Sequence, residues 1–311
     1  QGVDMTDEFA DMRSLFPIHS VRTAEPVPLP VAAAPVPLPE TYEWQGESRS
    51  VRALLEETAT SGLLVLADGE IVHEAYALTG GPEVRWISWS VSKSFVSALV
   101  GIALEEGRFG SVEEPVTKYV PELSGSAYDG VRIKDVLQMS SGASWNEDYG
   151  DYTTDISRFG MSIVFGNSQD AFAATLRREH EPGTYNRYNS TDTQVLGMLL
   201  TRVTGQTLAG YMQAKLWKPL HMERDAYWIT DDAGMELAFC GLNATLRDYA
   251  RFGELYRNGG RWNGEPVVPA AWVAASLRPD APHLQPGENP QSDWVVGYGY
   301  QWWIPESREG E

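Results

Sequence analysis

Hydrophobic residues recur at helical spacing just after a cluster of aromatic residues near position 90. From Ser92 onward the apolar positions lie three or four residues apart, at Phe95, Val96, Leu99, Val100, Ala103 and Leu104. This spacing predicts a helix with one buried face, and Gly107 is a suitable residue to end it. Trp86, Ile87 and Trp89 precede the helix. The segment is therefore expected to lie in the core.

Other patterns predict short elements on both sides of this helix. Two apolar runs, 62–67 and 71–76, flank Asp68-Gly69, which predicts a β-hairpin. Further helices are expected over 51–59, 133–139, 168–176, 191–204, 208–216 and 244–256, and an aromatic strand over 295–305. Residues 25–40 contain six prolines, which excludes a regular helix or central strand. They predict an extended, polyproline-like strap over the domain, or alternatively a disordered linker.

Ser90 and Lys93 form an S-x-x-K pattern at the start of the predicted core helix. Residues i and i+3 of a helix share one side, so the two side chains can touch. A serine hydroxyl becomes a nucleophile when a base takes its proton, and a lysine in apolar surroundings loses its charge readily enough to be that base. The alternative is an N-cap serine followed by a solvated lysine.

A second polar segment precedes the predicted helix at 191–204. It reads Pro-Gly-Thr-Tyr-Asn-Arg-Tyr-Asn-Ser over 182–190, which predicts a loop. Beside a lysine ammonium a phenol loses its proton more easily, so Tyr188 could accept the proton of Ser90 and pass it to a leaving group. The alternative is that Tyr185 and Tyr188 only pack.

Composition narrows the classes of partner. Asp and Glu number 43 against 24 Lys and Arg, which gives a net charge of −19. Such an acidic surface repels nucleic acid and anionic lipid, so neither is expected as a partner. Cys240 is the single cysteine and the five histidines lack ligand spacing, so neither a disulfide nor a metal site is expected. No apolar run is long enough to cross a bilayer, and a cytoplasmic location is favoured over export.

Together the two motifs resemble the superfamily of serine β-lactamases, penicillin-binding proteins and class C esterases, of which S-x-x-K is a signature. Tyr188-Asn189-Ser190 matches its Y-x-N or Y-x-S motif, with Ser190 where asparagine is usual. Three segments of the chain are similar to sequence blocks that recur in the class C branch of this superfamily: IKDVLQMSSGASW, EPGTYNRYNSTDTQVLG and GLNATLRDYARFGELYRNGG. Within that branch the chain looks closest to nylon-oligomer (6-aminohexanoate-dimer) hydrolases and related carboxylesterases. The segments that indicate this are MRSLFP at 12–17, WNEDY at 145–149 and GYGYQWW at 297–303.

The resemblance implies a fold and a site. The fold is an α/β/α sandwich of the β-lactamase/transpeptidase type, with an antiparallel sheet and an inserted all-helical domain. We expect an N-terminal Pro-rich strap at 1–47, an α/β domain at 48–106 and 230–311, and a helical insert at 107–229. The expected catalytic residues are Ser90, Lys93 and Tyr188, without metal or cofactor. Tyr149, on a mobile loop in that subgroup, Ser190 and Trp302 are the expected substrate-binding residues.

The sequence departs from the family in one respect. A third motif, of the K-T-G or H-x-G type, should follow the aromatic strand, and no such triplet stands there before Glu311. An unpaired sheet edge is a liability that folded proteins avoid. We therefore expect a second polypeptide segment to complete the sheet, beyond residue 311, and a homodimer is compatible with the sequence.

Three functions are weighed. The favoured one is a serine hydrolase that cleaves small carboxylic esters or amides through a Ser90 acyl-enzyme. The second is a β-lactamase or D,D-peptidase that uses the same serine. The third, supported by the missing motif, is a catalytically silent binding or scaffold protein with this fold.

Overall fold

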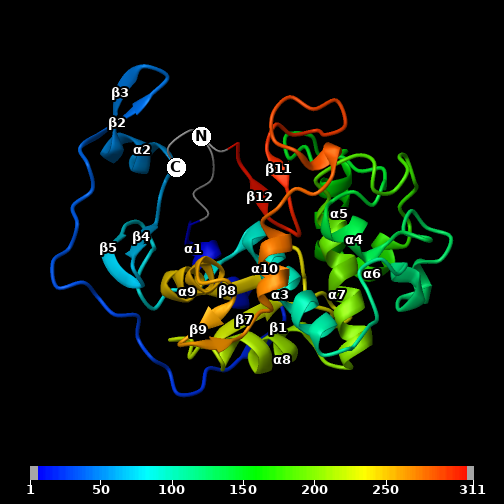
Figure 1. Cartoon of the computed structure of the whole chain (residues 1–311), viewed down its shortest axis with the longest axis horizontal. Coiled ribbons are helices and arrows are strands. Elements are labelled where there is room, and N and C mark those ends of the chain that lie inside the picture. The colour runs from blue at the N-terminus through cyan, green and yellow to red at the C-terminus, as the bar shows by residue number, and fades with distance from the viewer. Residues whose placement is uncertain (1–5, 307–311) are drawn as a thin grey trace.

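A four-stranded antiparallel sheet joins early and late parts of the chain in the computed structural model, which describes residues 6–306 (Figure 1). The strand order is β1-β7-β8-β6, with β1 at Ile18–Val21, β6 at Trp86–Ile87, β7 at Ala226–Ile229 and β8 at Leu242–Ala244. The register pairs Ile18 with Ile229. The family resemblance predicted an antiparallel sheet that unites distant segments, and this prediction is confirmed.

The predicted core helix is α3, Ser92–Glu105, and it is buried along almost its whole length. Gly107 follows with φ +67°, the left-handed conformation of a helix end. Phe95 of α3 stacks on Phe252 of α9 (Leu246–Arg257), with ring centroids 3.7 Å apart. A Cβ on Gly101 would meet the Trp272 ring of α10 (Ala270–Ser276) at 2.4 Å, so glycine permits this close approach.

The remaining helices are mostly short. The longest is α7, Ser190–Thr204, which packs against α3 and ends at Gly205 with φ +68°. Helices α4 to α7 lie together on the right of Figure 1. The other α-helices are α1 Thr6–Ala10, α2 Val51–Glu57, α4 Ile133–Leu137, α5 Asp155–Val164, α6 Gln169–Ala173 and α8 Leu208–Met212. A π-helical turn continues α8 over Gln213–Trp217, and 3-10 turns occupy Met12–Ser14, Trp89–Val91, Val116–Lys118, Pro121–Leu123 and Pro282–Leu284.

Four two-stranded hairpins surround this core. They are β2 Thr41–Trp44 with β3 Glu47–Ser50, β4 Gly62–Ala67 with β5 Glu70–Tyr76, β9 Arg261–Trp262 with β10 Glu265–Pro266, and β11 Gly297–Tyr298 with β12 Trp303–Ile304. The predicted hairpin at Asp68-Gly69 is confirmed. Both residues have positive φ, +50° and +82°, as a tight hairpin turn requires.

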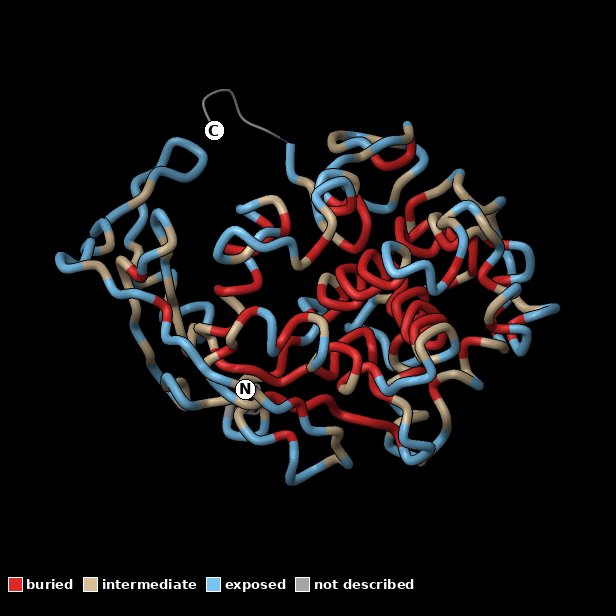
Figure 2. Tube along the Cα trace, turned by 60° about the horizontal axis from the view of Figure 1, so that its bottom comes forward, coloured by how far each residue is buried: buried red, intermediate tan, exposed pale blue. Residues whose placement is uncertain are grey.

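The segment 41–76, called the N-terminal lobe below, is much less buried than the rest. It holds β2 to β5 and α2, and no residue from 41 to 70 is buried. Figure 2 shows the same contrast, with buried residues concentrated around the long helices and the sheet, and the lobe mainly exposed or intermediate. The apolar sequence of β4 is thus only partly covered by the described residues.

The Pro-rich segment 25–40 contains no regular element and crosses the surface in extended form. A single parallel bridge joins Val31 to Ile71 of β5. The guanidinium of Arg251, fully buried in α9, donates to the carbonyl oxygens of Val27 and Leu220. Arg251 therefore fixes the start of the strap to the core.

Two elements differ from the sequence-based expectation. The segment 295–305 is a hairpin and not one strand, because the chain reverses at Gln301, where φ is +63° and the backbone N–H bonds to Leu137 O at 3.0 Å. Ala244 belongs to β8, and Thr245 caps α9 by accepting a hydrogen bond from Asp248 N. Among the described helices, none combines the length and hydropathy that a membrane span needs.

Candidate active site

Ser90 lies in the 3-10 turn that connects strand β6 to helix α3. Trp89, directly before it, has φ +44°, which is rare for a bulky residue and indicates a strained turn. Such strain clusters at functional sites, and here it presents Ser90 as an exposed side chain beside a buried helix.

Lys93, in the first turn of α3, is 2% exposed. Its Nζ donates to Ser90 Oγ at 3.0 Å and to the carbonyl oxygen of Phe239 at 2.9 Å. A buried amine needs polar partners because desolvation is costly, and these two bonds supply them. The buried lysine is therefore held against the hydroxyl of the exposed Ser90.

Tyr188 reaches the same place from the loop before α7. Lys93 Nζ lies 5.1 Å from the centroid of the Tyr188 ring. On another side the ring stacks on Trp303, with centroids 4.9 Å apart and planes at 21°. The backbone of this loop is fixed by Arg187 N, which donates to Met139 O at 2.9 Å. Lys93 thus contacts both the hydroxyl of Ser90 and the ring of Tyr188.

The buried carboxyl group of Asp192 is hydrogen-bonded to the loop that carries Tyr188. Asp192 Oδ1 accepts hydrogen bonds from Tyr128 OH at 2.9 Å, Ser141 Oγ at 2.7 Å and Asn189 Nδ2 at 3.1 Å. Desolvation raises the pKa of Asp192 to about 8, although the bonds from Ser141 and Tyr128 oppose the shift. Burial likewise raises the pKa of the Cys240 thiol to about 12, so that thiol stays protonated at neutral pH.

A cleft of about 830 Å³ opens beside Tyr188. Tyr149, 69% exposed, stands at its border, and its hydroxyl donates to Glu147 Oε1 at 2.8 Å. Aromatic and acidic side chains form most of the wall, from Trp145, Glu147, Asp148, Asp155, Glu179, Asp293 and Trp294. Ser190 is 1% exposed and donates its hydroxyl to Glu147 Oε1 at 2.7 Å, so it supports the wall from behind.

The two adjacent tryptophans of the closing hairpin lie in different environments. Trp302 packs against Tyr256 and Phe252, with centroids 4.5 and 6.2 Å away, and so faces the core. Trp303 is the one that stacks on Tyr188 and also meets Trp294 edge-on at 5.4 Å. Trp302 directly precedes β12, whose first residue is Trp303, and the two rings pack against different neighbours. The structure therefore does not bring Trp302 to the other site residues.

Sequence reasoning missed Glu147 and the carbonyl of Phe239, and it expected both Trp302 and Trp303 near the cleft. Glu147 lies in the quoted WNEDY block without a spacing that singles it out. A backbone carbonyl leaves no signal in the sequence. Among residues 6–306 no group of three or more His, Cys, Asp or Glu residues is placed to hold a metal ion.

Comparison with known proteins connects this geometry to a family. Residues 48–310 match the family model described as Beta-lactamase. The chain is 35% identical over 264 residues to the 6-aminohexanoate-dimer hydrolase of Paenarthrobacter ureafaciens, which covers 82% of this chain and 67% of the relative. It is 28% identical over 142 residues to a Beta-lactamase of Escherichia coli K12, covering 45% of this chain and 33% of that protein.

A solved structure shows the same fold over the whole chain. It is a Bacillus anthracis protein assigned as a 6-aminohexanoate-dimer hydrolase, with a TM-score of 0.87 and 22% sequence identity. The alignment covers 100% of this chain and 82% of the other. The predicted β-lactamase/transpeptidase-like fold is thereby confirmed.

Proposed function

Because the chain belongs to the beta-lactamase family and is a serine hydrolase, we propose that it cleaves small carboxylic esters or linear amides through an acyl-enzyme on Ser90. The observation that supports this most directly is the 3.0 Å hydrogen bond between Lys93 Nζ and Ser90 Oγ in a buried setting. A surface lysine capping a serine would be exposed, whereas Lys93 is 2% exposed.

In the proposed reaction, Ser90 Oγ attacks the substrate carbonyl carbon while its single proton is taken up by the Lys93–Tyr188 pair, which holds one proton fewer beforehand and shares the role of general base. The negative charge that forms on the carbonyl oxygen is stabilised by the backbone N–H of Ser90 near the start of α3. The same proton then goes to the leaving oxygen or nitrogen as its bond to the carbonyl carbon breaks. Water attacks the resulting serine ester, returns a proton to Ser90 and releases the acid.

The proposed substrate contacts follow from the cleft. Tyr149 borders it and is proposed to touch the substrate, while Ser190 holds the wall in place. On the closing hairpin we assign the contact to Trp303, because Trp302 faces the core. The cleft wall is both aromatic and acidic, and the 35% identical relative is a 6-aminohexanoate-dimer hydrolase, so linear amides belong to the proposed range.

A fluorophosphonate probe followed by mass spectrometry tests the nucleophile. We expect an adduct on Ser90 and none on the Ser90→Ala variant. A folded wild-type protein without an adduct would contradict the proposal and favour the silent, binding-protein function. A β-lactamase or D,D-peptidase activity is the second candidate, favoured by the similarity to the Escherichia coli Beta-lactamase. Turnover of nitrocefin far faster than that of p-nitrophenyl butyrate would favour it.

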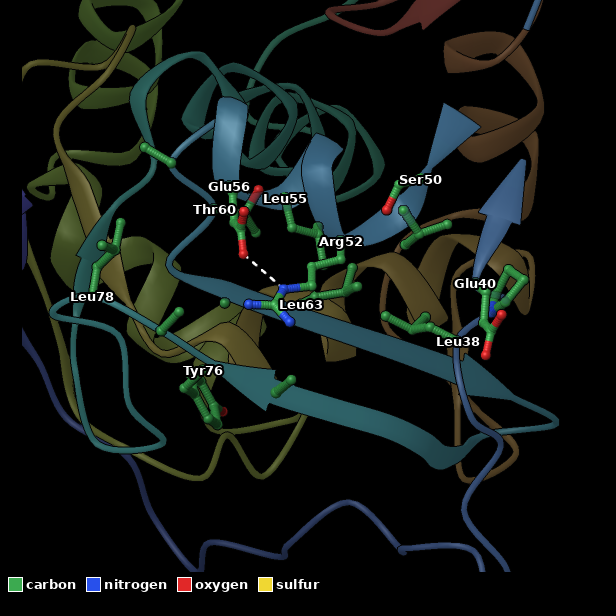
Figure 3. Close-up of a pocket in the computed structure, with 16 residues that line it drawn as sticks. Leu38, Glu40, Ser50, Arg52, Leu55, Glu56, Thr60, Leu63, Tyr76 and Leu78 are labelled. Carbon is green, nitrogen blue, oxygen red and sulfur yellow. Dashed lines mark hydrogen bonds and ion pairs between the residues drawn. The ribbon is translucent and has the colours of Figure 1, made fainter. Parts of the chain in front are cut away.

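We also propose that a further extended polypeptide segment pairs with the open strand edges near the N-terminal lobe. Within the described residues, β6 pairs only with β8, and β4 only with β5. A cavity of about 480 Å³ between them is lined by residues of both, including Gly62 and Ile87. A second cavity of about 520 Å³ lies under α2, where Figure 3 shows Leu38, Leu55, Leu63 and Leu78 around mainly apolar space.

Amide hydrogen exchange tests this pairing. If a segment pairs with the free edge of β4, the amides within 62–67 that point away from β5 also exchange slowly in the active protein, although no residue there is buried. Fast exchange of all of them, in protein that labels on Ser90, would contradict the pairing and leave the hydrolase proposal intact.

A further inference from the structure

The carboxylate of Glu147 accepts four hydrogen bonds from three residues, two of its own loop and one of helix α7. Oε2 accepts from Trp145 Nε1 at 2.7 Å and from Ser190 N at 2.9 Å. Oε1 accepts from Ser190 Oγ at 2.7 Å and from Tyr149 OH at 2.8 Å. All four donors are uncharged. Both oxygens are thus used for holding neighbouring groups.

The bond to Ser190 N gives this carboxylate a favourable electrostatic position. Ser190 is the first residue of the 15-residue helix α7, whose N-cap is Asn189. The first N–H groups of a helix are unpaired within it and carry a partial positive charge, so a carboxylate there is stabilised. Glu147 is therefore tied to a rigid, buried element by two bonds to one residue.

The loop that carries Tyr149 is held differently at its two sides. On the α5 side, Asn146 N donates to Asp155 Oδ2 at 2.9 Å, and Thr154 Oγ1 donates to Asp148 O at 3.0 Å. On the α7 side, the bonds from Ser190 to Glu147 join the loop to the helix. The same carboxylate also accepts a hydrogen bond from the Tyr149 hydroxyl.

The Tyr188 loop does not depend on this carboxylate. Asn186 Nδ2 donates to Gln138 O at 3.0 Å, Arg187 N donates to Met139 O, and Asn189 Nδ2 donates to Asp192. Removing the carboxylate should therefore disturb Tyr149 and leave Tyr188 in place beside Lys93.

We propose that Glu147 is a positioning residue that fixes the Tyr149 loop to the N-terminus of α7 and so sets the shape of the cleft for substrate. This inference rests on the proposed hydrolase function, since the cleft matters only if substrate enters it. Glu147 acts through Tyr149 and takes no part in bond making or breaking. A substitution of Glu147 is therefore expected to change KM and to leave kcat nearly unchanged.

Glu147→Gln is the informative substitution, because it keeps the shape and replaces one acceptor oxygen by an NH₂ group. The amide oxygen can keep the bonds from Trp145 Nε1 and Ser190 N only while the NH₂ group donates to the hydroxyls of Ser190 and Tyr149, so the bonds at this site lose the charge of the carboxylate. We expect KM for p-nitrophenyl butyrate to rise about tenfold, the size of one hydrogen bond to a charged group, with kcat within about threefold of wild type. Asp151→Asn is the matched control, because Asp151 accepts from Thr153 N and Thr153 Oγ1 in the same loop and contacts neither Tyr149 nor Ser190.

A double-mutant cycle separates positioning from a general loss of structure. In a Tyr149→Phe background, Glu147→Gln should raise KM by less than about twofold, because the contact through which it acts is gone. Fully additive effects, or a fall in kcat at constant KM, would overturn the proposal.

An exchange measurement keeps the test independent of turnover. The amide of Ser190 should exchange at least about tenfold faster in Glu147→Gln than in wild type or Asp151→Asn, because its acceptor is weakened. An unchanged rate would overturn the positioning role even in active enzyme. Absence of turnover in the wild type, with the exchange difference present, would instead contradict the hydrolase function.

Discussion

The helix α3 and the N-terminal lobe are both rich in apolar residues, yet only one of them is packed. In α3 the residues from Phe95 to Ala103 are all buried, and Lys93 finds two polar partners within the core. In the lobe, β4 reads Gly-Leu-Leu-Val-Leu-Ala and α2 contains two leucines, but no residue from 41 to 70 is buried. Apolar composition alone therefore does not create a core. A core needs a second surface, and α7, α9 and α10 supply it for α3.

Substitutions in the packed region should have their largest effect on catalysis, because only this region holds a lysine against the nucleophile. Lys93→Met keeps the length of the side chain and removes both polar bonds. We expect kcat/KM for p-nitrophenyl butyrate to fall on the order of 10⁴-fold, as for other deletions within a catalytic unit. The folded state should persist, as near-ultraviolet circular dichroism can show. A fall in kcat/KM of less than about tenfold would show that the buried lysine does not activate Ser90.

Truncation of one leucine in each region tests the packing itself. Leu99→Ala, at a fully buried position of α3, should lower the free energy of unfolding by about 3 kcal/mol. Leu54→Ala, at a position of α2 that is 38% exposed, should cost less than about 1 kcal/mol. Urea titration of both variants measures the two losses in the free energy of unfolding. Equal losses would show that a surface outside the described residues covers α2 in solution.

Only the packed region contains carboxyl groups whose pKa burial raises strongly. Desolvation raises the pKa of Asp192 to about 8 and that of Asp170 to about 6, whereas an unfolded aspartate titrates near 4. A raised pKa in the folded state means that the protonated group favours folding below pH 4. This contribution is lost as pH rises through about 6 for Asp170 and through about 8 for Asp192.

Asp192→Asn should therefore remove the later part of this pH dependence. Its oxygen can still accept the three bonds that Oδ1 accepts now. Relative to wild type, the variant should gain on the order of 4 kcal/mol between pH 5 and pH 9, and Asp170→Asn should alter only the part below about pH 6. Chemical denaturation across this range is the measurement. Parallel profiles for wild type and Asp192→Asn would refute the assignment.

The smallest effect is expected for an exposed ion pair of the lobe. Arg52 Nε lies 2.8 Å from Glu56 Oε1, and both side chains are well exposed. Water and salt screen such a pair, so Arg52→Ala should change the melting temperature by less than about 1 °C. A larger shift would indicate that this face of α2 is covered.

Local features of the fold and site were predictable because they depend on neighbours in the sequence. The spacing of Ser90 and Lys93 on one helix turn, and the Asp68-Gly69 hairpin, follow from helical and turn geometry. The approach of Tyr188 came from the family resemblance, since no local rule brings residue 188 to residue 90. Strands β1, β7 and β8 are too short for periodicity to reveal, and their pairing with each other is a tertiary effect.

The features that escaped prediction depend on backbone reversals and shared acceptors. The turn at Gln301 decides which of two tryptophans meets Tyr188, and a positive φ at glutamine has no clear sequence signal. The role proposed for Glu147 arises from three residues that donate hydrogen bonds to it. Two of them are its near neighbours Trp145 and Tyr149. The third, Ser190, comes from a distant loop.

Because Trp302 and Trp303 pack on opposite sides of the closing hairpin, the number of residues in this hairpin is constrained. Insertion or deletion of one residue between Tyr298 and Trp302 would exchange the ring that fills the interior for the ring that meets Tyr188. Evolution on this scaffold should therefore vary the cleft by replacing Trp303, or by lengthening the preceding surface loop at 285–295, while the residue count of the hairpin stays constant. Laboratory evolution with insertion libraries would meet the same restriction.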